Sequence, residues 1–422
     1  MPIPFQGRVL PLAPGTFRAL AHRNFRLFWL GQLVSLTGSW MQSLAQGWLV
    51  LRLTNSPFQL GLVGFCAFLP VLLFALVGGL AADRVRRRRA LLWTQGLATA
   101  QALTLTILTW TGRIQAWEVA VLAFALGTIN AFDIPIRQSF LHEMTGRDDL
   151  QNAIALNSLA FNAARLIGPA IAGLVLAAAG ETVCFLINTV SYVAVLAALA
   201  AIRVAPAARE DAEEGAWLAG IRDGLAYAWR EERVRRLLAL VAVSSVFGMP
   251  YSVLMPAVAR DVLGGSERTL GYLMGASGAG AILGALVVAG RRAAKGAEGA
   301  ATLGMAVFGG GLLAFSLSRS FATSFPFLVV VGAAMIVQMA VSNGFLQLAA
   351  PPALRGRVIS LYTLMFLGMA PFGSLLLGFL AKHFGTPAAI GTGGAVCLAS
   401  AIGFGGRRLV RRGPAVTPRP PA

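Results

Sequence analysis

The residues that could do chemistry in this chain are polar side chains set within long apolar stretches. In one stretch, five amides and hydroxyls follow one another at intervals of three, four, three and four residues: Gln32, Ser35, Ser39, Gln42 and Gln46. An α-helix places residues at this spacing on one face. Because polar groups at membrane depth are costly unless they meet a cavity or a partner, this face predicts either ligand binding or hydrogen bonds between helices.

A second polar group stands late in the chain, where Gln338, Ser342 and Asn343 interrupt another apolar stretch. Amide and hydroxyl groups suit the polar parts of an organic ligand, and aromatic rings suit its apolar parts. The aromatic residues expected beside such a ligand are Trp40, Phe247 and Tyr251.

A charged group also lies within the apolar stretches. Arg165 shares a helical face with Asn162, and an arginine at the centre of a membrane helix costs roughly 2.5–3.5 kcal/mol on insertion scales. Asp133 and Glu143 are candidate partners, but Arg137 can pair with Asp133 instead, and the sequence leaves this choice open. Asp133 is also the candidate for binding a proton inside the membrane.

Membrane-spanning helices must position these residues, because the composition allows little else. The 422 residues are 57% hydrophobic and 12% charged, whereas about a quarter of residues are charged in soluble domains. A helix needs about 20 apolar residues to cross a bilayer. Twelve such windows are predicted, at 26–51, 57–81, 90–111, 117–136, 152–179, 181–202, 237–259, 269–290, 300–317, 323–349, 358–381 and 387–406.

The distribution of positive charge predicts the orientation of these windows. If the N-terminus is cytoplasmic, 28 of the 35 Lys and Arg residues fall on the cytoplasmic side and six on the opposite side. Positively charged loops stay in the cytoplasm. We therefore expect both termini inside the cell, with a short tail at 1–24 that lacks a cleavable signal and a disordered tail at 411–422.

The chain repeats itself at about half its length. A shift of 210 residues superimposes 25–38 on 235–248 and matches Gly61 with Gly271, while a shift of 205 residues matches Gly173 with Gly378. Duplicated six-helix halves would produce such offsets. The sequence thus predicts an all-α integral membrane protein with twelve transmembrane helices in two pseudo-symmetric six-helix bundles, at 25–203 and 237–410.

The longest polar region, 204–236, joins the two predicted bundles. Its second part spaces Trp217, Ile221, Leu225 and Trp229 at intervals of four residues. This pattern predicts an amphipathic helix on the cytoplasmic face of the membrane, although a solvated linker helix would show the same spacing.

Other classes of protein fit the sequence less well. An enzyme or a metal site would need clustered nucleophiles, bases or ligands, yet His22, His142 and His383 are placed in loops or tails and the three cysteines stand singly in apolar windows. The arginines flank membrane helices, without a soluble domain to organise them for nucleic acid. A channel is a closer alternative, but duplicated halves fit alternating access better. We expect a monomer without metal or other cofactor.

The loop between the second and third windows carries the densest charge, in GGLAADRVRRRRAL at 78–91. The chain as a whole resembles the major facilitator superfamily, and five residues here fit its loop signature: Gly79, Asp83, Arg84, Arg87 and Arg88. Arg86 replaces the second glycine of that signature. The resemblance implies a gate in which the aspartate meets the start of another helix, although the arginines alone would also serve to fix the topology.

A second signature lies in the fifth window, where Gly168, Pro169 and Gly173 resemble the glycine-proline motif of proton-driven exporters. Together with AFDIPIRQSFLHEM at 131–144, it looks like the branch containing the enterobactin exporter and macrolide efflux proteins. The resemblance implies a proton-driven exporter of a bulky small molecule, such as a siderophore, a macrolide-like drug or a secondary metabolite, in a bacterial-type inner membrane. A lipid flippase or an importer of the same fold is the alternative, and ordinary small-residue packing also explains the glycines.

Overall fold

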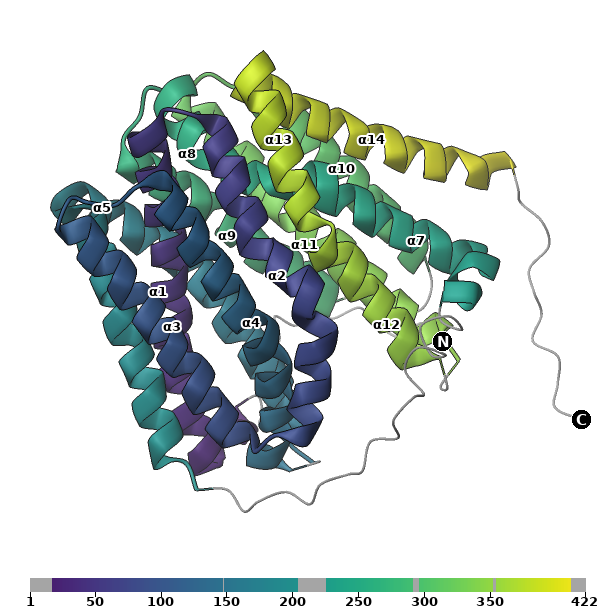
Figure 1. The fold of residues 1–422 in the computed structure, drawn as a ribbon. Coiled ribbons are helices and arrows are strands. Elements are labelled where there is room, and N and C mark those ends of the chain that lie inside the picture. The colour runs from purple at the N-terminus through teal and green to yellow at the C-terminus, as the bar shows by residue number, and fades with distance from the viewer. Residues whose placement is uncertain (1–16, 147, 204–224, 291–295, 352–353, 411–422) are drawn as a thin grey trace, which may run out of the picture.

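The computed structural model of this chain describes residues 17–146, 148–203, 225–290, 296–351 and 354–410, leaving aside the side chains at 76, 80, 83, 84 and 405–410. These ranges are built from helices and turns without any strand, as the sequence predicts (Figure 1). The tails at 1–16 and 411–422 lie outside the described residues, as does most of the predicted amphipathic helix of 217–229. The end of that helix is described, and residues 225–230 are helical.

The first half of the chain, a name we use for residues 17–203, forms five long helices and one short turn of 3₁₀-helix. Their bounds are η1 (Arg18–Ala21), α1 (Arg23–Thr54), α2 (Pro57–Arg84), α3 (Arg87–Trp110), α4 (Ala116–Thr145) and α5 (Leu150–Ala201). Helix α5 has 52 residues and contains one non-helical residue, Gly180, with φ 78°. Gly180 lies between the two predicted windows 152–179 and 181–202. The residue at this break is a glycine because only glycine adopts such a φ without steric cost.

The second half, residues 225–410, is less regular. Its elements are α7 (Glu232–Val243), η2 (Ser244–Gly248), η3 (Met249–Leu254), α8 (Met255–Ala257), η4 (Val258–Val262), α9 (Glu267–Ala289), α10 (Ala297–Leu317), α11 (Phe321–Ala349), α12 (Arg355–Thr363), η5 (Leu364–Gly368), α13 (Ala370–Phe384) and α14 (Thr386–Val410). The segment from α7 to η4 holds Pro250 and Pro256. Proline has no N–H to donate, so 3₁₀ and π geometry replaces regular α-helix there.

Ten helical segments in the described part of the chain are long and apolar enough to cross a membrane. The 52-residue α5 counts as one of them, and α7 through η4 counts as another. Helix α1 is not among the ten, because its face of amides and hydroxyls and its terminal arginines lower its hydropathy. The protein is therefore a multi-pass membrane protein.

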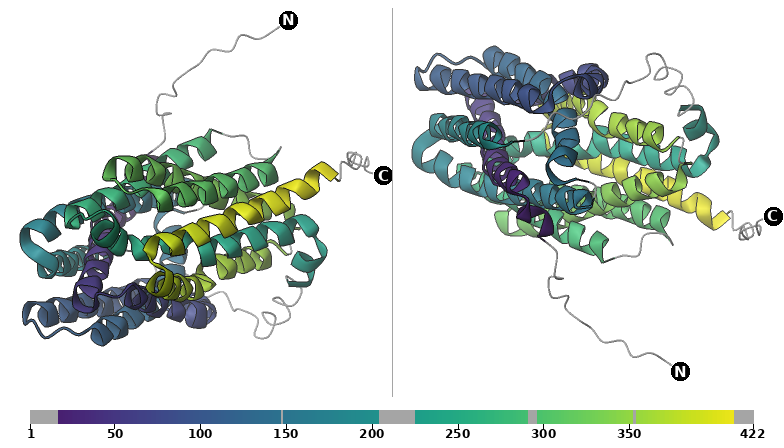
Figure 2. Two further views of the ribbon diagram at one scale, coloured as in Figure 1. Left: turned by 90° about the horizontal axis from the view of Figure 1, so that it is seen from above. Right: turned by 90° about the horizontal axis from the view of Figure 1, so that it is seen from below.

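Each half packs mainly on itself. In the first half α1 lies against α5, α2 against α4, and α3 against both α4 and α5; in the second half α10 lies against α11 and α14, and α9 against α11. The halves meet along two pairs of helices, α5 with α9 and α2 with α13. Figure 1 shows α2 beside α13, and the views in Figure 2 show the two halves lying beside each other.

Candidate functional site

The polar face of α1 lies inside the first half and is largely bonded there. Gln42 is buried; its amide donates to Gln101 Oε1 of α3 at 3.2 Å and its carbonyl accepts from Asn188 Nδ2 of α5 at 2.8 Å. Ser39 Oγ lies 3.3 Å from the hydroxyl of Tyr192, also on α5. Gln32 and Ser35 are buried and Gln46 is half-buried. At Gln42 and Ser39 the face thus makes hydrogen bonds between helices, one of the two outcomes that the sequence left open.

Asp133 of α4 sits in a second buried network, and its side chain is 3% exposed. Its Oδ1 accepts hydrogen bonds from Thr94 Oγ1 at 2.7 Å and from Gln95 Nε2 at 2.8 Å, both on α3. Arg137 Nε lies 3.5 Å from Oδ2, one helical turn away. Asp133 therefore pairs with Arg137, which decides the choice that the sequence left open.

The repeat relates this network to the polar pair on α11. A shift of 205 residues carries Asp133 onto Gln338, and Gln338 is likewise buried. A shift of 210 residues carries its partner Thr94 onto Gly304, and Gly304 packs directly against Gln338, whose backbone N is 3.0 Å from where a Cβ at Gly304 would lie. The shift thus relates Asp133 to a residue that lies beside a glycine instead of a threonine.

Gln338 and Ser342 of α11 differ from Asp133 in making no side-chain hydrogen bond to the described residues. Both amide atoms of Gln338 and the hydroxyl of Ser342 are buried, and none has a hydrogen-bond partner among the described residues. Asn343, the other predicted ligand-binding residue of this helix, is half-buried and accepts from Gln347 Nε2 at 2.6 Å. Neither Gln338 nor Ser342 lines open space in this conformation.

Arg165 lies where the two halves meet. Its guanidinium carbon is 5.9 Å from the ring centroid of Trp40 on α1, within the range of a cation–π contact. Among the described residues no carboxylate lies within ion-pair distance, so the suggested partner Glu143 is wrong. Glu143 accepts from Arg87 Nη1 at 2.6 Å instead. Asn162, on the same face, donates to the backbone carbonyl of Ser158 at 2.8 Å.

The arginines of the basic loop bond within the first half. Arg87 ties the loop to α4 through Glu143. Arg88 donates to the carbonyls of Leu199 and Ala200 at 2.7 and 2.8 Å. These carbonyls lie at the C-terminal end of α5, where the helix dipole stabilises a positive charge. A side chain at Gly79 would meet nothing within 4 Å. The side chains of the predicted gate residues Asp83 and Arg84 lie outside the described ones.

The glycine-proline motif of α5 forms close contacts with two helices. A methyl group at Gly168 would lie 2.6 Å from the Cβ of Trp40, and one at Gly173 would lie 2.8 Å from the Cα of Gly271 on α9. The carbonyl of Pro169 faces Gly271 as well. The motif therefore lies on the contact between α5 and α9.

The other contact between the halves repeats this arrangement. A methyl group at Gly61 of α2 would lie 2.8 Å from the Cα of Gly378 on α13. The shift of 210 residues matches Gly61 with Gly271, and the shift of 205 residues matches Gly173 with Gly378. The same four glycines therefore form both crossings, with Gly61 against Gly378 and Gly173 against Gly271.

An arginine that the sequence did not single out also bridges the halves. Arg260 of η4 donates from Nη1 to the carbonyl of Leu51 at 3.3 Å and to Asn55 Oδ1 at 2.9 Å, and its Nε bonds Asp261 at 2.6 Å. Asn55 caps the end of α1 with φ 49°, a left-handed conformation that asparagine tolerates. The signal in the sequence was weak, because an asparagine after a helix and an arginine in a distant loop do not indicate each other.

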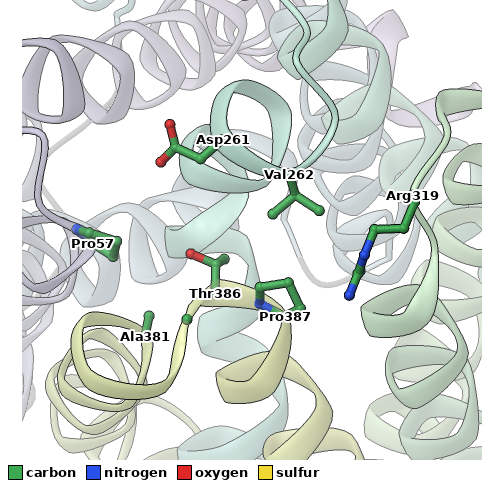
Figure 3. Close-up of a pocket in the computed structure, with 8 residues that line it drawn as sticks. Pro57, Asp261, Val262, Arg319, Ala381, Thr386 and Pro387 are labelled. Atoms are coloured by element: carbon green, nitrogen blue, oxygen red, sulfur yellow. The ribbon is translucent and has the colours of Figure 1, made fainter.

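An open cavity of about 430 Å³ lies at this same end of the molecule. Its lining includes Pro57, Asp261 and Arg319, and Figure 3 shows Asp261 and Arg319 on either side of Val262. None of the residues predicted as site residues from the sequence lines this cavity. It adjoins the turns at the ends of the helices, away from the polar networks.

The N-terminal segment is fastened at the opposite end of the molecule. Asp149, before α5, accepts a hydrogen bond from His22 Nε2 at 2.8 Å and is also bonded by Arg18. These contacts hold the pKa of the Asp149 carboxyl below its usual value, with the His22 hydrogen bond as the larger cause. Residues 18–24, which the sequence placed in a tail, thus form η1 and the start of α1.

The helices that are long and apolar enough to cross a membrane define a multi-pass membrane protein with buried polar networks. The profile of the family described as transmembrane secretion effector matches residues 14–413. The chain belongs to this family of the major facilitator superfamily, in its branch of siderophore and drug efflux.

Among proteins of known role, the chain is similar to the staphyloferrin A transporter of Staphylococcus aureus, with 26% identity over 85% of this chain and 90% of the relative. It is 29% identical to the multidrug efflux pump Tap of Mycolicibacterium fortuitum, over 84% and 88% of the two chains. Among solved structures, a bacterial homologue of the lysosomal transporter Spinster in an inward-facing conformation matches with a TM-score of 0.69 at 12% identity, over 92% and 95%. A D-xylose–proton symporter matches with 0.68 at 15% identity, over 90% and 95%.

Proposed function

We propose that this protein is a secondary active exporter that moves a bulky small molecule out of the cell by alternating access. The proposal rests on a difference between the two ends of the molecule: side-chain hydrogen bonds join the halves at one end, and the described arginines at the other end make none between the halves. Two glycine crossings and the Arg260 bridge join them, whereas the described arginines of the basic loop bond only within the first half. Such an arrangement fits a conformation that is closed at the Arg260 end and open at the other.

We infer twelve crossings in two bundles of six helices. At about 1.5 Å per residue, the 52 residues of α5 are long enough for two crossings of a core of about 30 Å, and Gly180 supplies the break. Helix α1, with 32 residues, also has the length for one crossing. The bundles span 25–203 and 237–410, joined by 204–236, with tails at 1–24 and 411–422.

The charge distribution supports placing the basic loop and both termini in the cytoplasm, in a bacterial-type inner membrane. The Arg260 end then faces outward, and the conformation is inward-facing. In the exchange to an outward-facing form the halves rock about the crossings Gly61–Gly378 and Gly173–Gly271, where backbones touch without intervening side chains. Arg260 leaves Asn55 and Leu51, and the basic loop gains contacts with the second half.

The relatives support export as the direction and an organic compound as the cargo. One transports staphyloferrin A and another is a multidrug efflux pump, and a third, 21% identical over 63% of this chain, is macrolide efflux protein A of Streptococcus pyogenes. We propose a siderophore, a macrolide-like compound or a secondary metabolite as cargo. The half-buried aromatic rings at the junction of the halves, Trp40 among them, suit the apolar part of such a compound.

We further propose that protons drive the export and that Asp133 binds them. Protonation of Asp133 would remove the negative charge that faces Arg137 and would weaken the hydrogen bonds from Thr94 and Gln95. These bonds join α3 to α4, so we propose that a proton on Asp133 changes how these two helices pack. Inside-out vesicles carrying Asp133→Asn test this proposal: unchanged dependence of transport on the pH gradient would remove Asp133 from the coupling.

Expression in an efflux-deficient bacterial host tests the proposed export. Cells carrying the protein should accumulate less erythromycin, rhodamine 6G or staphyloferrin A than cells carrying an empty vector, and dissipation of the proton gradient should abolish the difference. Cells carrying the Gly61→Val variant, which blocks one crossing, serve as the inactive control. Accumulation equal to the empty vector across this panel and a wider set of siderophores and antibiotics would contradict the proposal.

A further inference from the structure

The position of Arg165 at the junction of the halves gives it access to elements of both. Its side chain lies under the ring of Trp40 from α1 and interacts electrostatically with Tyr251 from η3. Its backbone carbonyl lies 2.9 Å from where a Cβ at Gly278 of α9 would be. The cation thus meets Trp40 of the first half and Tyr251 of the second, and its backbone packs against α9.

The two acidic side chains that the sequence suggested as partners of Arg165 are bonded elsewhere. Asp133 is bonded by Thr94, Gln95 and Arg137, and Glu143 is bonded by Arg87. Among the described residues Arg165 has no ion pair. A cation at membrane depth is costly, and its counter-charge marks the function of such a site. The protein itself therefore leaves this charge to be balanced by something else.

The other groups around Arg165 are neutral and of two kinds. Trp40 and Phe161 offer an aromatic pair whose ring centroids are 5.9 Å apart at an interplanar angle of 66°. The hydroxyl of Tyr251 lies 2.6 Å from Ser277 Oγ, and this neutral group can donate or accept a hydrogen bond. Arg165 is half-buried and lies on the helix of the first half that packs against α9 of the second. An aromatic wall beside a single cation is suited to an organic anion.

We propose that Arg165 binds an anionic group, such as a carboxylate, of the transported compound, and that the compound's apolar part packs on Trp40 and Phe161. This inference rests on the proposed export function and names the class of cargo at its site. The planar fork of a guanidinium matches a carboxylate with two hydrogen bonds, which an inorganic anion such as chloride cannot accept in the same way. The preferred cargo is therefore an organic anion rather than an organic cation.

Binding to the purified full-length protein in lipid nanodiscs tests this inference. The anionic probes are citrate, cholate and carboxyfluorescein, and rhodamine 6G is the cationic reference. The affinity of each probe is measured from the rise in unfolding temperature that it causes. For the two dyes, fluorescence polarisation gives a second measurement of affinity. The affinity for at least one anion should fall about ten- to a hundredfold in Arg165→Gln, as for loss of a charge-assisted pair. The affinity for rhodamine 6G should change less than threefold.

Two further variants separate charge from folding. Arg165→Lys keeps the charge but loses the fork, so its affinity for the anion should fall below that of wild type and above that of a folded Arg165→Gln. If Arg165→Gln does not fold, the comparison of Arg165→Lys with wild type tests the inference. Arg113→Gln removes an exposed arginine from the turn after α3 and should bind like wild type. Anion binding that is equal in wild type, Arg165→Lys and any folded Arg165→Gln would overturn the inference, as would the absence of binding by all three anions.

The inference and the proposed function fail in different ways. If cells export rhodamine 6G or erythromycin but no anion depends on Arg165, the protein is an exporter and the inference about its cargo is wrong. If anions bind through Arg165 but no compound is exported, the proposed function is wrong instead.

Discussion

The Arg260 bridge predicts a measurable shift between conformations. Arg260→Ala removes two hydrogen bonds between the halves, to the Leu51 carbonyl and to Asn55 Oδ1. A bond of this kind contributes about 0.5–1.5 kcal/mol, and because the arginine side chain is 29% exposed we take the lower part of that range. The loss is then about 1–2 kcal/mol in favour of the form that is open at this end, a change of roughly 5–30-fold in the population ratio.

Distances between spin labels across this end of the molecule measure the shift. Labels at Arg113→Cys, in the turn after α3, and at Ser320→Cys, before α11, lie on exposed positions of the two halves, in a background without the native cysteines. Arg260→Ala should raise the long-distance population. Arg268→Ala is the matched control, because it removes an exposed arginine near the same turn without a bond across the halves. A distance distribution that is the same in both variants would refute the role given to Arg260.

Three other predictions concern packing, polar burial and pH. Gly378→Ala should lower the free energy of unfolding by about 1–3 kcal/mol, because its methyl group would lie against Gly61, whereas Gly344→Ala meets nothing within 4 Å and should be neutral or stabilising; chemical unfolding in detergent compares them. Gln338→Met removes an unbonded buried amide and should raise thermal stability by about 1–3 kcal/mol; a loss of stability would show that the amide has a partner. Because the pKa of Asp149 is lower in the folded protein, its carboxylate stabilises the fold at pH values above the unfolded pKa of about 3.9. This contribution is lost as the pH falls through the folded pKa. In a plot of unfolding free energy from pH 7 to pH 3, Asp149→Asn should therefore lose less stability toward acid than wild type, and an equal loss would argue against this role.

The helical architecture could be predicted from the sequence because length and hydropathy govern membrane crossing directly. The repeat also carried structural information: of the glycines that matched at shifts of 210 and 205 residues, Gly61, Gly271, Gly173 and Gly378 lie at the contacts between the halves. The windows 152–179 and 181–202, drawn from apolar length alone, left Gly180 between them, and the structure has its non-helical residue there, with φ 78°.

The partners of the polar residues could not be predicted in this way. Hydropathy shows that Gln42 and Asp133 need partners, but not which of the neighbouring helices supplies them. Gln101 and Thr94 come from α3, whose polar residues were not singled out. The pairing of Arg87 with Glu143 depends on how α3 lies against α4, which the local sequence of neither helix contains.

The central claim is that the two halves move an organic compound outward at the expense of a proton gradient. The most direct measurement uses purified protein in liposomes, with the proton gradient imposed across the membrane and erythromycin and rhodamine 6G supplied on the side that corresponds to the cytoplasm. We expect uphill transport of at least one compound that stops when the gradient is dissipated and is lost in the Gly61→Val variant. Equal rates in liposomes with and without the protein, for these and for the anions that bind Arg165, would contradict it.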